Sequence, residues 1–187
     1  MPKELPSISY LHKVLRYEPD TGFLYWRERT PDMFTQNGTR PVKDICTNWN
    51  AKMSGKRGFT TQNEDGYHQG TLYGNTHRAV HVVWALCKGV WPRDTGLWVD
   101  HINNIRSDDR LANLQLLTPS QNARKRLPTD ANPSGVIGVS FDKDQGKWRA
   151  RIRSGGKRVH LGRYTTLEEA AAVREAAEKE YGYGVYA

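Results

Sequence analysis

Cysteine and long apolar runs are scarce in this chain of 187 residues. Cys46 and Cys87 stand far apart and no Cys-x-x-Cys occurs, so a structural zinc ribbon is not expected and both are interpreted as buried or half-buried thiols. No apolar run approaches the ~18 residues of a membrane span. The N-terminal residues also lack the apolar stretch of a signal peptide. We therefore expect an intracellular protein that is neither secreted nor embedded in a membrane.

Acidic residues are also few, with 20 Asp and Glu against 28 Lys and Arg, which leaves a net charge of +8. Such a balance favours a polyanionic partner, with nucleic acid the first candidate and an anionic membrane surface the second. Hydrophobic residues make up 37% of the chain, so the core should be modest. The length allows one domain with a real core, or two or three small modules.

Periodicity and turn signals divide the chain into three stretches, with a linker between the second and the third. Residues 1–76 mix one helical pattern near the N-terminus with hairpin signals, among them an aromatic strand at 23–26 that follows a Pro-Asp-Thr-Gly turn. Residues 77–128 form a second stretch, 129–134 a linker, and 135–187 a third module. The role of residues 1–76 stays open.

The second stretch contains a helix, two strands and a second helix. An apolar stripe at helical spacing runs from Val80 to Cys87 and is closed by Gly89. Strands are predicted at 97–102 and 113–117. Thr118 is the predicted N-cap of the following helix, with proline in its first turn.

This second stretch carries the residues for one kind of chemistry, the metal-assisted cleavage of a phosphodiester. That reaction needs a base for water, a cation for the phosphate and a scaffold that holds both. The imidazole of His101 suits the base, and Mg²⁺ prefers oxygen ligands such as the Asp100 carboxylate and the Asn122 amide. Because adjacent strand residues point to opposite faces, Asp100 and His101 share a site only if the strand ends or twists there.

The stretch Trp-Val-Asp-His-Ile-Asn-Asn-Ile at 98–105, with Asn113 and Asn122, resembles the HNH nuclease superfamily in its His-Asn-Asn form. The resemblance implies a ββα-metal core in which His101 is the general base. It further implies that Asp100 and Asn122 bind a divalent metal ion, Mg²⁺ with Mn²⁺ as a substitute, and that Asn113 pins the loop. His81 matches a histidine that often opens the upstream helix, and no chemistry is assigned to it.

The chain departs from the usual HNH pattern at two loop positions. Asn104 stands where glycine is common, and we expect it to accept a positive φ. Asp109 stands where asparagine is common, and we expect it to be solvated. His12, His68 and His77 follow no pattern and are interpreted as surface or packing residues.

The third module has cationic side chains in strict alternation. Lys147, Arg149, Arg151 and Arg153 should share one face of a strand, and Arg158 and His160 should continue that face on the next strand. From 134 to 163 there are eight Lys and Arg against two Asp, and such crowding of like charges is relieved by a polyanion. A further basic cluster, Arg124-Lys125-Arg126, precedes the linker.

This module resembles the Apetala/ethylene-response-factor DNA-binding domain. The match runs through Gly-Val-Ile-Gly-Val at 135–139, Trp-Arg-Ala-Arg-Ile at 148–152, Leu-Gly-Arg-Tyr at 161–164 and Thr-Leu-Glu-Glu-Ala-Ala at 166–171. It implies a three-stranded antiparallel sheet in the major groove, backed by one helix, with Arg151, Arg153 and Arg158 at contact positions. His160 replaces a common tryptophan and Ser140 a common arginine, so the sequence preference does not transfer.

Together these patterns predict an α+β chain in which a hairpin-rich region, a ββα-metal core and a helix-backed sheet follow one another. The predicted activity is metal-dependent, homing-type cleavage of double-stranded DNA, with nicking as the default for a monomer and no obligate protein partner. The bacterial host cytoplasm is its location if a phage encodes it. A DNA-binding regulator or architectural protein with an inactive core is the alternative, and a charge-driven RNA or membrane-surface binder explains neither motif. The target site and oligomeric state stay open.

Overall fold

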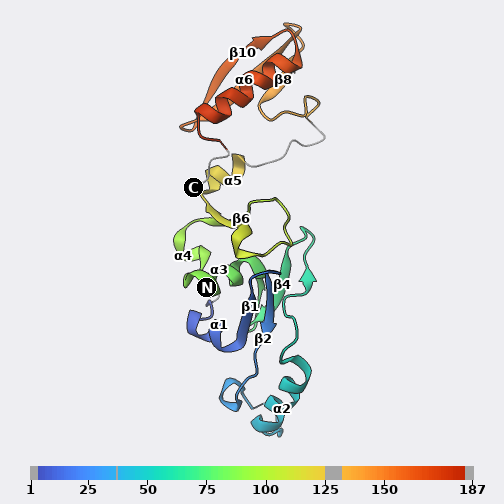
Figure 1. Cartoon of the computed structure of the whole chain (residues 1–187), viewed down its shortest axis with the longest axis vertical. Coiled ribbons are helices and arrows are strands. Elements are labelled where there is room, and N and C mark those ends of the chain that lie inside the picture. Colours follow the sequence, from blue (N-terminus) through green and yellow to red (C-terminus); the bar gives the residue numbers. More distant parts are fainter. Residues whose placement is uncertain (1–3, 37, 125–131, 184–187) are drawn as a thin grey trace. The chain divides into compact units, whose positions relative to one another are not determined.

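The computed structural model describes residues 4–36, 38–124 and 132–183. The chain divides into two compact units, 1–118 and 119–187, each with its own secondary structure (Figure 1). The helices of the first unit are α1 (Ile8–Val14), η1 (Pro31–Met33), α2 (Val42–Met53), α3 (Ala79–Lys88), α4 (Pro92–Thr95) and η2 (Leu111–Asn113). Its strands are β1 (Leu15–Glu18), β2 (Phe23–Trp26), β3 (Thr61–Gln62), β4 (His68–Leu72), β5 (Asn75–Arg78), β6 (Trp98–His101) and β7 (Leu114–Leu117). The second unit contains α5 (Pro119–Arg124), β8 (Val139–Asp142), β9 (Lys147–Ser154), β10 (Lys157–Tyr164) and α6 (Leu167–Glu180).

Short antiparallel sheets make up the β-structure of the first unit. β1 pairs with β2, β6 pairs with β7, and β3, β4 and β5 form a meander in that order. The predicted turn before β2 is present, and Gly22 adopts a φ of +75° there. α3 ends at Gly89, whose φ of +72° satisfies the left-handed cap that the sequence predicts.

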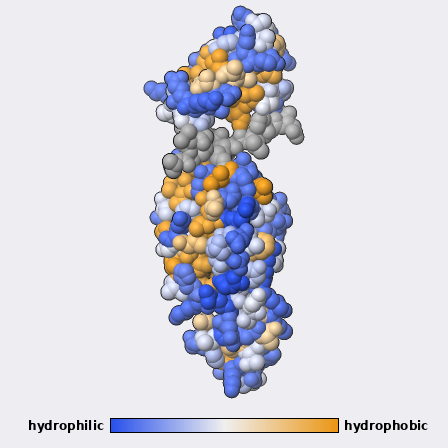
Figure 2. Space-filling view, viewed as in Figure 1, coloured by the Kyte–Doolittle hydropathy of each residue, from blue (hydrophilic) through white to orange (hydrophobic). Residues whose placement is uncertain are grey.

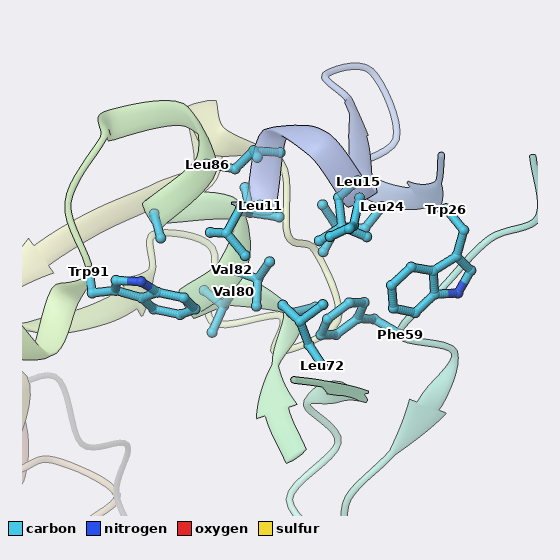
Figure 3. Packing of buried hydrophobic residues seen from close by; sticks show 14 of the residues in the cluster. Leu11, Leu15, Leu24, Trp26, Phe59, Leu72, Val80, Val82, Leu86 and Trp91 are labelled. Atoms are coloured by element: carbon cyan, nitrogen blue, oxygen red, sulfur yellow. The ribbon is translucent and has the colours of Figure 1, made fainter. Parts of the chain in front are cut away.

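One hydrophobic core serves the whole first unit. α3 contributes six buried residues, among them Val80 and Val82, and the α1 residue Leu11 is fully buried against them. Leu24, Phe59 and Leu72 come from the hairpins before residue 76 and pack in the same cluster, as Figure 3 shows. The elements on both sides of residue 76 therefore stabilise one another.

α2 is a helix that the sequence analysis did not predict. We expected a single helix before residue 76, near the N-terminus, and hairpins elsewhere, whereas α2 is a second helix that runs from Val42 to Met53. Only Cys46 is buried on it, so it lacks the apolar stripe by which helices are recognised. It lies at the end of the first unit away from β6, where Trp49 packs edge-on against Trp26 (Figure 1).

The second unit is a three-stranded antiparallel sheet, in the order β10-β9-β8, with α6 packed against it (Figure 1). This confirms the predicted sheet and helix. Thr166 and Glu169 form a capping box at the start of α6. Ala170 and Ala177 are buried, so the small-residue face of the helix lies close to the strands.

Arg174 is a buried cation on α6 that the sequence did not predict. It is 3% exposed, its Nε donates to the Ile137 carbonyl at 3.0 Å, and it pairs with Glu178. A Cβ atom at Gly138 would lie 2.4 Å from the Arg151 carbonyl oxygen and 2.6 Å from the Arg174 Nε. Glycine is therefore required there by both neighbours as well as by its own φ of +83°.

The surface is mostly hydrophilic in the view of Figure 2, with hydrophobic residues gathered over part of the first unit. Large apolar side chains that are exposed in the described ranges include Trp98, Ile102, Ile105 and Phe141. Of the helices formed by described residues, none has the length and apolar character that crossing a membrane requires.

Candidate functional site

The predicted base and metal ligand lie side by side at the end of β6. The strand register pairs Asp100 with Gln115 and His101 with Leu114. His101 is the last residue of β6, so the strand ends where a site shared by the two side chains requires it to end. Gln115 Nε2 donates to Asp100 Oδ2 at 2.8 Å, and the carboxylate is half-buried. His101 is 3% exposed and its ring lies 5.7 Å from that of Tyr67.

The partner of His101 is Asp109, and here the expectation of a solvated carboxylate was wrong. Asp109 is 3% exposed, and its Oδ1 lies 3.2 Å from His101 Nε2. Its Oδ2 lies 3.2 Å from His68 Nδ1 on β4. One buried carboxylate thus joins two histidines, one from the predicted nuclease core and one from the hairpins before it.

His68 also contacts donors of its own neighbourhood. Its Nε2 lies 3.4 Å from the Arg57 guanidinium and 3.5 Å from Gln62 Nε2. The expectation that His68 is a surface or packing residue therefore misses its contacts, because its side chain is 12% exposed and bonded at both ring nitrogens. His77, by contrast, packs against Trp91.

Asn113 holds the loop between β6 and β7 through three side-chain hydrogen bonds. Its Oδ1 accepts from the Asn103 backbone at 3.0 Å, and its Nδ2 donates to Asn103 Oδ1 and to the Asp108 carbonyl, both at 2.9 Å. Asn104 has a φ of +61°, as expected for the position where glycine is common. The Arg110 guanidinium bonds the Asp108 carboxylate and lowers the pKa of that group to about 2. These contacts are what a loop-bracing role for Asn113 requires.

Residues before 76 support the same loop from outside. The Tyr17 hydroxyl accepts from the Leu111 backbone at 2.7 Å. Burial raises the pKa of that hydroxyl. Gly22 lies so close to the chain that a Cβ there would be 2.5 Å from the Arg110 nitrogen and 2.6 Å from the Asp109 carbonyl carbon. The β1–β2 turn therefore limits where Asp109 can lie.

His81 lies on α3, where burial lowers the pKa of its ring from the ordinary 6.5 to about 4. The charges of Arg78 and His77 lower this pKa further, and the charge of Asp109 raises it. The imidazole is therefore neutral at neutral pH. His81 lies in the first turn of α3, and its predicted structural role stays a prediction.

Acid should destabilise the first unit through His81. Because the folded pKa lies below the unfolded one, stability is fully present above pH 6.5 and is lost as the pH falls towards about 4. The full loss, reached below pH 4, is about 3 kcal/mol. Urea unfolding at pH 7.5 and pH 4.5 would measure most of this loss, with His81→Gln as the control that lacks the titrating ring. An equal loss in both proteins would contradict this account.

Asn122, the second predicted metal ligand, lies on α5 in the second unit, so its contribution to a shared site stays a prediction. Within 4–36, 38–124 and 132–183, no three His, Cys, Asp or Glu side chains are grouped to hold a metal ion. A site with one carboxylate and one amide oxygen has a different composition, and this donor set suits a hard divalent cation that keeps several waters. The predicted ligands therefore fit Mg²⁺ by their chemistry.

A second candidate site is the cationic face of the second unit, defined by the outward residues of β9 and β10: Lys147, Arg149, Arg151, Arg153, Arg158, His160 and Arg163. The register pairs Arg158 with Arg153, His160 with Arg151, and Arg163 with Arg149. Their neighbours Ala150 and Ile152 are buried against the other side. The predicted alternation therefore holds along β9 and up to His160 on β10, where the register shifts before Gly162.

Like charges lie close together on this face. Partial burial lowers the pKa of Arg151, and the cations of Arg149 and Arg158 lower it further. Asp142 at the edge of the sheet partly offsets the crowding, with its Oδ2 3.3 Å from Arg163 Nε and 3.8 Å from Arg149. Arg124 ends α5, and Lys125 and Arg126 lie outside the described residues.

Comparison with known proteins bears on both sites. Residues 77–124 match the HNH endonuclease family. Residues 134–181 match the AP2 domain. Both resemblances seen in the sequence are thereby confirmed, and together they leave the N-terminal hairpins outside either match.

Two individual proteins are also similar to this chain. Protein 3.8 of Escherichia phage T7 is 29% identical over 100 residues, which is 54% of this chain and 81% of that protein. The solved structure described as DNA binding and cleavage by the HNH homing endonuclease I-HmuI is 18% identical, with a TM-score of 0.39, and the match covers 96% of this chain and 84% of that one.

Asp109 and His68 are the polar residues near the HNH histidine that sequence reasoning missed. His68 lies outside the segment that matches the HNH endonuclease family, 41 residues from Asp109 in sequence. No local pattern marks such a pair. The one available signal was Asp109 itself, an ionised side chain at a position where asparagine is common.

Proposed function

We propose that this protein is a metal-dependent HNH endonuclease that hydrolyses phosphodiester bonds in double-stranded DNA. The observation that carries the proposal is the buried imidazole of His101 on the β6–β7 hairpin, next to Asp100 and within a segment that matches the HNH endonuclease family. The AP2 match and the cationic face support DNA as the partner. The activity is of the homing type, with a single site per chain that nicks one strand.

In the proposed reaction His101 removes a proton from a water molecule aimed at phosphorus. Its burial keeps bulk water from the imidazole, and its bond to Asp109 fixes the plane of the ring. Asn113 keeps the loop after β6 in place through its three hydrogen bonds. The chain thereby supplies a base of fixed orientation.

Asp100 and Asn122 are the residues that would hold Mg²⁺, for which Mn²⁺ could substitute. When bound, the ion supplies positive charge for the scissile phosphate and for the leaving oxygen. Gln115 orients the Asp100 carboxylate through its 2.8 Å hydrogen bond, so it belongs to the same proposed site.

The cationic face would position the duplex. Arginine forks fit both phosphate oxygens and guanine edges, and the major groove admits a two-stranded ribbon such as β9 paired with β10. Arg151 and Arg153 lie on the central strand β9, and Arg158 and His160 lie opposite them on β10. The Arg124-Lys125-Arg126 cluster is proposed to add contacts to the phosphate backbone.

Relaxation of supercoiled plasmid tests the proposal. We expect nicked circles with Mg²⁺ or Mn²⁺ and none with EDTA. Because one plasmid can lack the target sequence, the assay uses a panel of substrates that includes the DNA of a bacterial host. Tight DNA binding without metal-dependent cutting on every substrate would favour the alternative, a DNA-binding regulator with an inactive core.

Arg151→Ala should weaken binding to a cognate duplex by ~1–3 kcal/mol if Arg151 contacts bases. Lys143→Ala removes the same charge from the exposed β8–β9 turn, off the cationic face, and serves as the matched control. Affinity would be measured by fluorescence anisotropy at several salt concentrations, because phosphate contacts give log affinity a slope near −0.9 each against log salt. An equal loss on all sequences would mean that Arg151 contacts phosphate alone.

A further inference from the structure

The protons of the cluster formed by His68, Asp109 and His101 can be assigned from the partners of each atom. Arg57 has only donors, so the His68 Nε2 that faces it at 3.4 Å must be an acceptor. A neutral His68 therefore carries its proton on Nδ1, 3.2 Å from Asp109 Oδ2. The ionised carboxylate only accepts, so His101 Nε2 donates to Oδ1.

The same assignment bears on His101. A proton on Nε2 leaves the lone pair of the ring on Nδ1, so Nδ1 is the atom that we expect to take a proton from water. A buried carboxylate that bonds one ring nitrogen of a histidine holds the tautomer and the ring orientation of that base. Asparagine, common at this position in HNH segments, presents one acceptor and one donor instead of two acceptors.

We propose that Asp109 and His68 are positioning residues for the base His101. They form a chain of hydrogen bonds, called the relay below, that holds the His101 ring in place from the N-terminal hairpins. The inference rests on the proposed function and extends it to a residue outside the HNH match. Asp109 holds His101, and His68 holds the second oxygen of Asp109 so that the carboxylate cannot rotate. Arg57 and Gln62 in turn fix His68.

The geometry also explains why the hairpins approach the nuclease loop so closely. The backbone of Gly22 lies against Asp109 and Arg110, and Tyr17 accepts from Leu111. Both contacts fix the backbone from which Asp109 projects. The relay therefore has a rigid support at each end, β4 for His68 and the β1–β2 turn for Asp109.

The first test measures tautomers by nitrogen NMR of the full chain with ¹⁵N-labelled histidine. Free neutral imidazole favours the Nε2–H form, so an Nδ1–H form at His68 is a specific signature of the relay. We expect Nδ1–H at His68 and Nε2–H at His101, assigned through His68→Ala and His101→Gln. This readout does not depend on cleavage.

The second test compares single-turnover cleavage at saturating DNA. Asp109→Asn should slow cleavage roughly 10- to 100-fold with DNA affinity unchanged, because the amide cannot accept from both histidines. Asp108→Asn is the matched control, since Asp108 braces the same loop through Arg110 and Asn103 without touching His101. His68→Asn keeps a donor near the Nδ1 position and should retain more of the rate than His68→Ala.

Each outcome decides the matter. If wild type does not cut any substrate, the proposed function fails while the tautomers still test the relay. The relay is overturned if His68 is the Nε2–H tautomer in wild type, or if Asp109→Asn shifts the tautomers without slowing an active enzyme. A rate loss in Asp108→Asn as large as in Asp109→Asn would reduce Asp109 to a loop brace. If Asp109→Asn does not fold, the pair of His68 variants decides.

Discussion

His101→Ala should lower the rate of metal-dependent DNA cleavage by ~10²–10⁴-fold, the usual contribution of a positioned general base. Binding to the same DNA should stay close to wild type, because the cationic face lies on β9 and β10, in the other unit. Rates would be measured on supercoiled plasmid under single-turnover conditions, and affinity by gel shift in EDTA. The split between rate and affinity is the expected signature of a group that acts on the reacting water.

Two variants control this result. His12→Ala removes an exposed imidazole from α1 and should leave cleavage unchanged. His101→Gln keeps a polar side chain next to the buried Asp109 carboxylate, so it separates loss of the base from loss of the fold. Full activity of a folded His101→Gln protein would remove His101 from the reaction.

Leu72→Ala should destabilise the first unit by ~2–5 kcal/mol, the usual result of truncating a fully buried leucine. Leu72 is 1% exposed on β4 and belongs to the cluster that includes α3. Cleavage by this variant should be lost near its own, lower unfolding temperature. Leu72 and His68 lie on the same strand, so unfolding of β4 also displaces His68. Calorimetry with tryptophan fluorescence would measure the shift.

The second unit offers the matched control for this prediction. Ile152 is 2% exposed on β9, so Ile152→Ala should destabilise the helix-backed sheet and leave the unfolding of the first unit in place. Two transitions that shift separately are expected because the two hydrophobic clusters share no residue. A single transition that moves equally in both variants would contradict independent cores.

The sequence predicted elements whose side chains repeat at a regular period. The alternation from Lys147 to Arg153 placed the cations on one face of β9, and the apolar stripe before Gly89 placed α3. In both cases the period of the backbone decides which side chains meet, so neighbours in sequence carry the information.

The burial of charged side chains could not be predicted in the same way. Asp109 and Arg174 are charged, and composition places such residues at the surface unless a distant partner is known. Their partners, His68 for one and the Ile137 carbonyl for the other, come from strands and loops far along the chain. α2 was missed for a related reason, since it buries little and so carries no apolar period.

The shared core of the first unit restricts how such a protein can be recombined in evolution. A crossover between genes at residue 76 would separate Leu72 and Phe59 from the helix they cover, and both products would be left with an unmatched half of a core. A crossover after residue 118 would divide neither of the two buried clusters formed by the described residues. A lineage can therefore exchange the sheet that we propose to contact DNA, whereas the hairpins and the HNH segment must be inherited together.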